Sequence, residues 1–480
     1  MKRPVLYIVF VLLSLVWTGC AKKNEVKEPH SEAELSGLTI ATSNGTYYQI
    51  KFSQREDVNL YVANIETDAI QAVRQGKADV YVSDEVLLTE EDQQRLGMKM
   101  AFRGEECFDV AFALKKGNTE LMAQLNAFLA TAPLNDIIDH WIHGGPEVPE
   151  PPYEIDPNAE PLHCVTGANI TPISFLCDEG EWKGIDPDIL RRFAHSQGRQ
   201  FEMSYQDLGA AIIGLSTGQA DIVSANLIIT DERKKSVDFS NSYYKCHPGY
   251  FVADKSKGGG MAYLERLKMN LIAENRWRLI TDGLAVTLII TICSILLGSL
   301  LGVGVCACRR SKRKWLRKSA DIYSAFINGI PTLVLLLIMF YVVFASSGLN
   351  AIVVAIITFS LCFASSSGAI FDNAISSVPI GQTEAGLSLG FTPYKTFTGI
   401  VFPQAVCKGI NLYIGECIAL LKNTSIVGYI AIQDITRASD LIRSRTFDAL
   451  VPLLIVTILY FVLAWLLRKA LMLIIKKEAR

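Results

Sequence analysis

Two stretches of the sequence repeat one pattern: Gly76-Lys77-Ala78-Asp79-Val80-Tyr81-Val82-Ser83 and Gly218-Gln219-Ala220-Asp221-Ile222-Val223-Ser224-Ala225. In both, an apolar helical pattern ends at the glycine and a strand follows. Any α/β unit can show a helix, a glycine and a strand, but the shared Gly-x-Ala-Asp and apolar positions favour two similar α/β lobes.

The two stretches are separated by a proline-rich segment, residues 146–160, with prolines at 146, 149, 151, 152 and 157 and acidic residues between them. Such a segment cannot form a helix or a central strand. It predicts an extended linker between two pieces of α/β sequence, 36–145 and 161–257.

The second half of the chain has a different character, with long apolar runs broken by short polar loops over 281–475. A helix needs about 20 apolar residues to cross the hydrocarbon core of a membrane. Five segments qualify and predict an all-α membrane domain of five spans after a second linker, 258–280; they are 284–308, 322–345, 349–371, 406–427 and 450–467.

The N-terminal segment 1–35 has the pattern of a secretory signal. Lys2 and Arg3 precede an apolar stretch that ends in Trp17-Thr18-Gly19-Cys20. This ending is similar to a lipobox and predicts a lipid on Cys20, with an uncleaved signal anchor as the alternative. Either interpretation puts the α/β pieces outside the cytoplasm.

The placement of basic residues predicts the orientation of the spans, because cytoplasmic loops retain Lys and Arg. Seven such residues lie between Arg309 and Lys318, so this loop is expected in the cytoplasm and the α/β pieces on the other side. Over the whole chain 46 basic and 48 acidic residues nearly cancel, which gives no indication of nucleic acid as a partner. Neither a zinc-type spacing nor a cofactor motif is found, and any pairing of Cys107, Cys164, Cys177 and Cys246 stays open.

The two α/β pieces resemble the amino-acid type (family 3) periplasmic solute-binding proteins, but in reverse order. Residues 161–257 resemble the start of such a protein, with Gly184-Ile185-Asp186-Pro187-Asp188 and Ile229-Thr230-Asp231-Glu232-Arg233. Residues 36–145 resemble its end, with Asn44-Gly45-Thr46 and Val82-Ser83-Asp84-Glu85. The resemblance implies one two-lobed, circularly permuted binding domain. The alternative is two truncated domains, each with half of its core exposed.

The same resemblance implies how a ligand is held: Arg233 binds the carboxylate of an α-amino acid and Asp84 its ammonium group. A guanidinium matches a carboxylate with two parallel hydrogen bonds, and a carboxylate accepts bonds from an ammonium. The alternative for both is an exposed surface charge. Further expected contacts are Thr46, Tyr47, Asn226 and Thr230, with Ile170 and Leu208 where the family often has aromatic residues; Tyr47 fits a lobe core equally well.

The most specific motif follows the third predicted span: Gly381-Gln382-Thr383-Glu384-Ala385-Gly386, then Gly390, Ile400 and Pro403. It resembles the cytoplasmic loop of importer permeases, in which Glu-Ala-Ala is followed at fixed spacing by Gly, Ile and Leu-Pro; Gly386 and Phe402 depart from that pattern. The resemblance implies that Glu384, Ala385, Gly386, Gly390, Ile400 and Pro403 form a helix pair that seats in a groove of an ATP-hydrolysing subunit.

The resemblance to polar amino-acid importer permeases covers nearly all of 280–470. Glu416 and Lys422 fall inside or at the end of a predicted span, where a charge is costly and indicates a water-lined path or a pairing with neighbouring helices. Together with Asn328, which stands where an arginine is frequent, they are the candidate residues of a translocation path.

No Gly-x-x-x-x-Gly-Lys-Ser/Thr phosphate loop occurs, so we expect no enzyme activity here and a separate cytoplasmic ATPase subunit. Five spans are few for a path, which suggests a homodimer. The sequence therefore predicts the fused substrate-binding and permease subunit of an ATP-driven importer for amino acids or similar small polar solutes in a bacterial inner membrane. The alternatives are a ligand-gated sensor or channel and an envelope enzyme that uses the same clamp.

Overall fold

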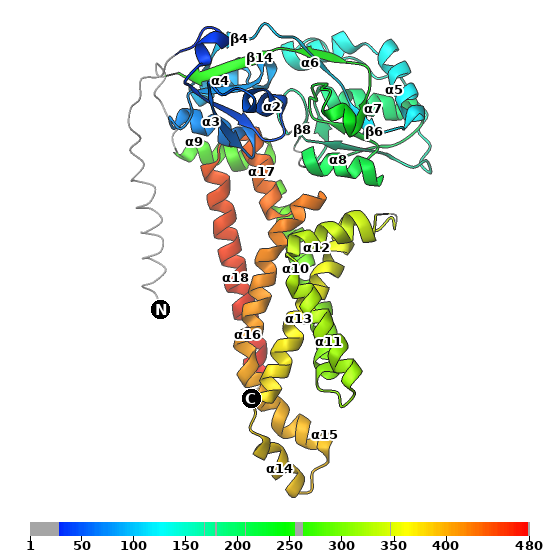
Figure 1. The fold of residues 1–480 in the computed structure, drawn as a ribbon, viewed down its shortest axis with the longest axis vertical. Helices are drawn as coiled ribbons and strands as arrows, with labels where there is room; N and C mark the ends of the chain where they lie inside the picture. Colours follow the sequence, from blue (N-terminus) through cyan, green and yellow to red (C-terminus); the bar gives the residue numbers. More distant parts are fainter. Residues whose placement is uncertain are drawn as a thin grey trace.

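The computed structural model describes residues 28–167, 169–177, 180–206, 208–254, 263–345 and 347–478. A mixed α/β region sits on one end of a long bundle of helices (Figure 1). The predicted signal segment and Cys20 lie outside the described residues.

One lobe of the α/β region, here named the β1 lobe, is built on a five-stranded sheet of order β2-β1-β3-β14-β4. Its central strand β3 (Val80–Asp84) is buried along its whole length, as its apolar sequence requires. The strands β1, β2 and β3 are parallel, and β14 runs antiparallel to them. The other elements of this lobe are β1 (Thr39–Ser43), β2 (Asn59–Ala63), β4 (Met98–Arg103), β14 (Pro248–Ala253), α2 (Tyr47–Ser53), α3 (Glu66–Arg74) and α4 (Glu90–Leu96).

The other lobe, here named the β7 lobe, has the matching sheet order β10-β7-β11-β6-β12. Its strands are β6 (Ala113–Lys115), β7 (Leu162–Thr166), β10 (Phe201–Tyr205), β11 (Ile222–Ser224) and β12 (Val237–Phe239). Its helices are α5 (Thr119–Thr131), α6 (Leu134–His143), α7 (Ile185–Ser196) and α8 (Leu208–Thr217), and a short hairpin joins β8 (Phe175–Leu176) to β9 (Trp182–Lys183).

Each lobe contains elements from both sides of the proline-rich linker. Strand β14 comes from the later piece but lies between β3 and β4, whereas β6 comes from the earlier piece but lies between β11 and β12. Where the chain passes between the lobes, β5 (Phe108–Val110) pairs antiparallel with β13 (Tyr244–Cys246). The two pieces are therefore interlocked through both sheets.

The linker forms neither helix nor strand, as predicted, and it lies against the β7 lobe. Arg192 on α7 donates to the carbonyl oxygens of Val148 (2.6 Å) and Pro149 (3.2 Å), and His195 contacts Glu150 at 2.6 Å. These contacts fix the path of the linker along the surface. The cysteines left open by the sequence, Cys107, Cys164, Cys177 and Cys246, are all free.

The helical region contains three described helices that are long and apolar enough to cross a membrane: α10 (Trp277–Arg309), α13 (Ala351–Ser376) and residues Leu450–Leu473 of α18 (Leu450–Glu478). Helix α16 (Phe402–Asn423) lies beside them and continues into a 3-10 turn, Thr424–Ile430. Length and composition thus support three spans, and a fourth if a bent helix pair counts as one, rather than the five predicted.

The predicted span 322–345 is bent in the structure. Helix α11 (Lys314–Gly329) stops, and α12 (Thr332–Ile338), extended by a π turn at Met339–Val343, leaves at 101°. Pro331 lies at the break, where it lacks the N–H that a continuous helix needs. The sequence pattern was apolar enough for one span, but it did not reveal this corner.

Small residues let α10 and α13 pack closely. A Cβ on Gly298 would lie 2.8 Å from Cβ of Phe363, and one on Gly302 would lie 2.2 Å from Oγ of Ser367. Lipid is as apolar as these side chains, so close backbone approach, rather than burial from water, is expected to hold such helices together.

Three of the remaining helices lie at the two ends of the bundle (Figure 1). Helix α17 (Ile435–Thr446) lies under the lobes, whereas α14 (Ile380–Ser388) and α15 (Pro393–Thr396) lie at the opposite end. The short elements are α9 (Tyr263–Leu267), 3-10 turns at Glu32–Leu35, Glu85–Leu87, Arg233–Lys235 and Ala273–Asn275, and π turns at Lys268–Ile272 and Phe397–Val401.

Candidate ligand cleft and coupling loop

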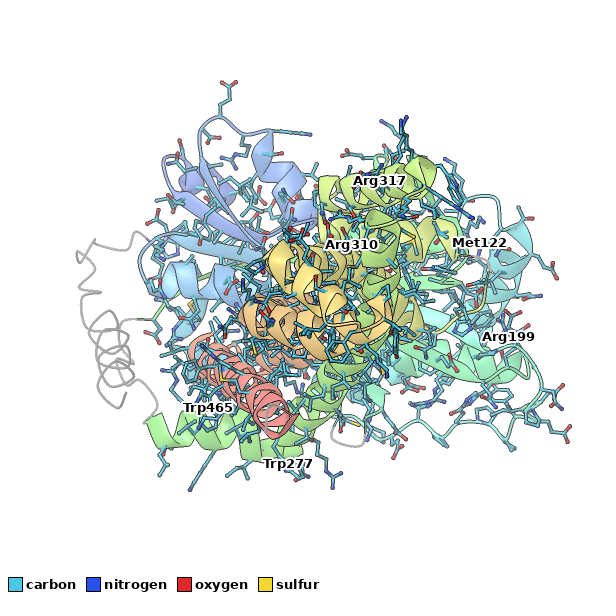
Figure 2. All side chains as sticks on the ribbon, turned by 90° about the horizontal axis from the view of Figure 1, so that it is seen from below. Met122, Arg199, Trp277, Arg310, Arg317 and Trp465 are labelled. Atoms are coloured by element: carbon cyan, nitrogen blue, oxygen red, sulfur yellow. The ribbon has the colours of Figure 1, made fainter. Side chains whose placement is uncertain are left out.

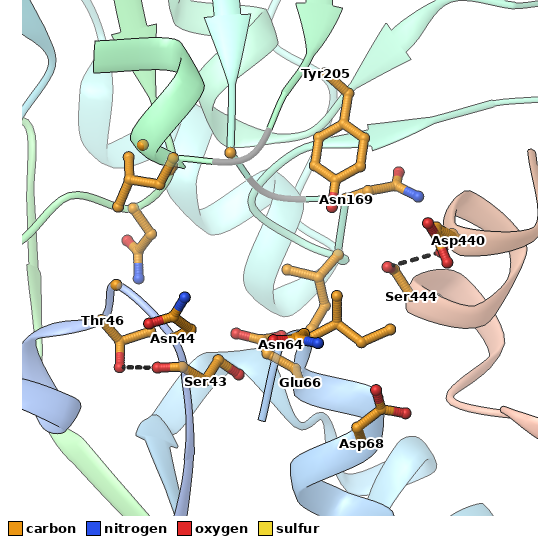
Figure 3. A pocket seen from close by; sticks show the side chains of 18 of the residues that line it. Ser43, Asn44, Thr46, Asn64, Glu66, Asp68, Asn169, Tyr205, Asp440 and Ser444 are labelled. Carbon is orange, nitrogen blue, oxygen red and sulfur yellow. Dashed lines mark hydrogen bonds between the residues drawn. The ribbon is translucent and has the colours of Figure 1, made fainter. Parts of the chain in front are cut away.

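A cavity of about 810 Å³ lies between the two lobes and the helical region. In the lobes its walls are formed by residues at or just after the carboxyl ends of strands, which is where open α/β sheets place ligands. On the side of the helical region it is lined by the 3-10 turn Thr424–Ile430 and by α17. Asp440 and Ser444 of α17 are labelled in Figure 3. The cavity therefore extends from the cleft between the lobes to the helices below.

Seven of the eight residues that the sequence predicted as ligand contacts line this cavity: Asp84, Thr46, Tyr47, Asn226, Ile170, Leu208 and Arg233. The eighth, Thr230, is not part of the lining. Its Oγ1 accepts a hydrogen bond from the backbone N–H of Arg233 at 3.2 Å, so it helps to fix the turn that carries Arg233.

Arg233 reaches from the β7 lobe to the β1 lobe. Its Nη1 donates to the carbonyl oxygen of Ile228 (2.9 Å), and its Nη2 donates to that of Gly45 (2.7 Å) in the opposite lobe. Burial lowers the pKa of Arg233, and the negative charge of Asp84 opposes this effect. The guanidinium therefore stands at the cleft with only backbone carbonyls as hydrogen-bond acceptors among the described residues.

Asp84, at the end of β3, is 5% exposed and is bound from both lobes. Its carboxylate accepts hydrogen bonds from the hydroxyl of Tyr48 (2.6 Å), the thiol of Cys246 (3.4 Å) and the side-chain amide of Asn226 across the cleft. Burial raises the pKa of Asp84 to about 6, although these hydrogen bonds act in the opposite direction. Asp84 thus titrates near neutral pH.

Thr46 and Tyr47 serve the local fold as well as lining the cavity. Thr46 is the N-cap of α2: its Oγ1 accepts from the backbone N–H of Gln49 at 3.3 Å and donates to the carbonyl of Ser43 at 2.7 Å. The ring of Tyr47 packs on Phe108 with 4.6 Å between ring centroids. Tyr47 therefore lines the cleft and also packs against the interior of the lobe, so each of its two predicted roles describes part of its surroundings.

The cavity also contains residues that the sequence analysis missed, above all Ser43 and, at the start of α3, Glu66 and Asp68. Their positions in the sequence could have indicated them, because Ser43 ends β1 and Glu66 closely follows the carboxyl end of β2. Glu66 forms no hydrogen bond or ion pair with any residue that the structure describes. Burial, and next the charge of Asp84, raise the pKa of Glu66 to about 7.

Helix α17 contacts both lobes beside the cavity. On the β1 lobe, Arg443 forms ion pairs with Asp68 (2.6 Å) and with Asp440 of its own helix (3.1 Å). On the β7 lobe, the guanidinium of Arg437 lies 3.9 Å from the ring centroid of Tyr205, and the carbonyl of Leu441 accepts a 2.9 Å bond from the amide of Asn169. No local pattern could have revealed the contacts of α17 with the lobes, because they join residues more than 200 positions apart.

The predicted coupling motif forms a helix pair at the far end of the bundle. Glu384 and Ala385 on α14 are exposed, and Gly386 is buried where α14 crosses α15: a Cβ there would lie 2.6 Å from Cγ2 of Thr396. Gly390 adopts the left-handed φ of +82° that the turn between the helices needs. Ile400 is partly buried and Pro403 is exposed at the start of α16. The glycine that departed from the family pattern is thus explained by close helix contact.

The three candidate path residues are not brought together. The amide oxygen of Asn328 on α11 accepts a bond from Ser365 on α13 at 3.3 Å. Glu416 is partly buried within α16, and Lys422 is exposed near its end. Within the described part of the chain no hydrogen bond or ion pair joins any two of them, and no group of His, Cys, Asp or Glu side chains is placed to hold a metal ion.

Comparison with known proteins gives relatives for both parts. Residues 162–404 match the bacterial extracellular solute-binding proteins, family 3. The chain is 30% identical over 183 residues to the probable amino-acid ABC transporter permease protein YckA of Bacillus subtilis, covering 38% of this chain and 81% of that protein. It is 32% identical over 200 residues to the L-cystine transport system permease protein TcyB of the same organism, covering 41% and 86%. A crystal structure of an amino acid ABC transporter with histidines is 28% identical, covers 45% of this chain and 99% of its own, and has a TM-score of 0.40.

Proposed function

Because the chain belongs to the bacterial extracellular solute-binding proteins of family 3 and to the amino-acid ABC transporter permeases, we propose that it captures an amino acid in its cleft and passes it directly to its own membrane helices. It is the fused substrate-binding and permease subunit of an amino-acid importer. The observation that carries the direct transfer is the single cavity that both lobes and helix α17 line together.

We propose that the pieces 36–145 and 161–257 form one circularly permuted clamp. The support is the exchange of strands: β14 completes the sheet of the β1 lobe, and β6 completes that of the β7 lobe. Both lobes then hold full five-stranded sheets, which two truncated domains would lack. The antiparallel pair β5–β13 is the natural hinge, because the chain passes between the lobes there.

In this clamp the α-carboxylate of the ligand binds the guanidinium of Arg233, and the α-ammonium binds Asp84. Both residues already make a hydrogen bond across the cleft, Arg233 to Gly45 and Asp84 to Asn226. A zwitterionic ligand can replace both contacts with charge-assisted ones, which are stronger. Ile170 and Leu208 leave an apolar wall beside these polar groups.

The relatives are ABC transporter permeases, which implies a separate ATPase subunit as partner. We propose that it docks on α14 and α15. Around the exposed Glu384, large apolar side chains are uncovered, with Leu389 and Tyr394 each 76% exposed. An apolar surface of this kind is typical of a protein interface.

The proposed orientation puts α14, α15 and the basic loop 309–318 in the cytoplasm and the clamp outside the inner membrane. The loop, with Arg310 and the following Arg317, can be found in the view from below (Figure 2). We propose that a second copy of the chain completes the path, which would cover Lys422 and Asn328, both exposed in the single chain. Lipidation of Cys20 remains a prediction for a segment outside the described residues.

The test is to reconstitute the full chain with its ATPase in liposomes, measure binding of the twenty amino acids by calorimetry, and measure uptake of those that bind. We expect binding of at least one amino acid and ATP-dependent uptake of the same one. Binding without uptake in the presence of active ATPase would contradict the transfer function, and uptake without binding to the clamp would contradict its role as receptor.

A further inference from the structure

The charges that line the cavity do not balance. Three arginines face five carboxylates, and the members are Arg233, Arg437, Arg443, Glu66, Asp68, Asp84, Asp434 and Asp440. A bound α-amino acid is itself neutral, because it brings one ammonium and one carboxylate. The excess of two negative charges therefore persists when the ligand side chain is neutral, and a positive side chain lowers it to one.

Most of these charges have partners within the protein. Arg443 pairs with both Asp68 and Asp440, and Arg437 lies on the ring of Tyr205. Asp434 caps the start of α17, where its carboxylate accepts from the backbone N–H groups of Thr436 (3.1 Å) and Arg437 (2.9 Å). The charged groups that remain to bind a ligand lie in the cleft between the two lobes, and they are Arg233, Asp84 and Glu66.

Glu66 differs from an ordinary acidic residue at a helix start. A negative charge at a helix start is stabilised by the helix dipole. Glu90 is an example of such a residue, because it is also the first residue of its helix, α4, and Thr89 caps that helix. Unlike Glu66, Glu90 is exposed and lies outside the cavity lining. Glu66 is partly buried in the cavity wall, and the preceding Ile65 gives no side-chain cap. Its carboxylate has no cation as partner among the described residues.

A second observation points to a donor-rich ligand in the same cavity. Ser43 and Asn226 line the cavity and are only 7% and 8% exposed, yet Oγ of Ser43 and Oδ1 of Asn226 have no hydrogen-bond partner among the residues that the structure describes. A buried polar atom without a partner costs free energy, so a ligand that supplies N–H groups gains by binding there. The amide oxygen of Asn226 can only accept, so it selects for a donor.

The inference that follows rests on the proposed function, in which Arg233 and Asp84 hold the two charged groups common to all α-amino acids. We propose that the cleft is specific for amino acids with a cationic side chain, and that Glu66 is the residue that binds the side-chain cation. The α-groups then neutralise Arg233 and Asp84, and the side chain neutralises Glu66, so that every charge at the cleft is paired.

The test compares two ligands of nearly the same shape, L-arginine and its neutral analogue L-citrulline, by titration calorimetry on the purified full chain in nanodiscs at pH 7.5. We expect arginine to bind at least about tenfold more tightly, as expected for one desolvated charge pair. Glu66→Gln should bring the affinity for arginine down to that for citrulline. The matched control Glu90→Gln should leave the preference for arginine unchanged.

The possible outcomes separate the proposed side-chain specificity from the proposed ligand class. Equal affinity of the wild-type chain for both ligands would overturn the cationic specificity while leaving an amino-acid importer, and this comparison does not depend on whether any variant folds. An equal loss of affinity for both ligands in Glu66→Gln would also overturn it, because Glu66 would then serve the α-ammonium. If neither these nor any other amino acid binds, the proposed ligand class fails together with the inference.

Discussion

Arg443 on α17 and Asp68 on α3 form an ion pair with 2.6 Å between Nη2 and Oδ1, although 375 residues separate them in the chain. The pair joins the helical region to the β1 lobe, and the hydroxyl of the adjacent Thr67 donates to the carbonyl of Arg443 at 2.9 Å. Because Arg437 and Leu441 of the same helix contact the β7 lobe, α17 is positioned to respond to the distance between the lobes.

We therefore expect Arg443→Ala to weaken the link between ligand binding and ATP hydrolysis. A residue on such a contact chain changes coupling free energies by about 0.5–2 kcal/mol. The measurement is ligand-stimulated ATPase activity of the reconstituted importer. Arg55→Ala, which breaks an ion pair with Asp57 on the surface of the β1 lobe, is the control and should leave stimulation intact. Equal stimulation in wild type and Arg443→Ala would exclude α17 as the connection.

Removal of either predicted ligand charge should reduce affinity strongly. Arg233→Ala and Asp84→Ala are each expected to cost about 2–5 kcal/mol of binding free energy, because the opposite charge of the ligand is left unpaired in the cleft. Calorimetry with the cognate amino acid measures this. Lys234→Ala, next to Arg233 in sequence, is the control. Unchanged affinity in both cleft variants would mean that the geometry implied by the family does not apply.

Ligand affinity should fall on acidification because a proton competes with the ligand ammonium for Asp84. With the pKa of Asp84 near 6, protonation of Asp84 alone is expected to lower the apparent affinity about tenfold between pH 7 and pH 5. Protonation of Glu66, whose pKa is about 7, adds to this loss for a ligand with a cationic side chain. The stability contribution has the opposite sign: between about pH 4 and 6 folded Asp84 binds more protons than the unfolded chain, so this group favours folding as pH falls. Calorimetry and thermal melts over this range separate the two effects, and a flat affinity profile would argue against Asp84 as the ammonium site.

Glu384→Lys should abolish transport and ligand-stimulated ATP hydrolysis while leaving ligand binding intact. The residue is exposed on α14, at the opposite end of the molecule from the cleft, so its charge reversal affects only a docked partner (Figure 1). Glu120→Lys on α5 makes the same charge change at another exposed helical residue and serves as control. Transport retained in Glu384→Lys would contradict docking at this loop.

The sequence was most informative about residues that belong to a short motif with a known chemical role. Asp84 at the end of a buried strand and Arg233 in Thr-Asp-Glu-Arg were expected at the cleft, and both line its cavity. The predicted coupling motif followed from its resemblance to a family pattern, and within it Gly386 lies where α14 crosses α15. Hydropathy predicted the long helices α10, α13 and α18, since their composition is nearly uniform.

The sequence was least informative about contacts between distant segments. Glu66 carries no motif, and only the sheet topology brings the start of α3 to the cleft. The break at Pro331 was missed because the residues on both sides of it are apolar. Hydropathy alone does not show whether two consecutive apolar helices continue in one direction or bend. The contacts of α17 with Asp68 and Tyr205 depend on how the lobes sit on the bundle, which no local pattern encodes.

The position of β14 between β3 and β4 has a consequence for biosynthesis. The ribosome completes β3 and β4 some 150 residues before β14, so the sheet of the β1 lobe has a gap in its middle until the chain has been made and exported as far as Ala253. Both neighbours of the missing strand present unpaired backbone groups during that time, which is a known route to aggregation. The sheet of the β1 lobe can therefore be completed only just before the first long apolar helix, α10, is synthesised.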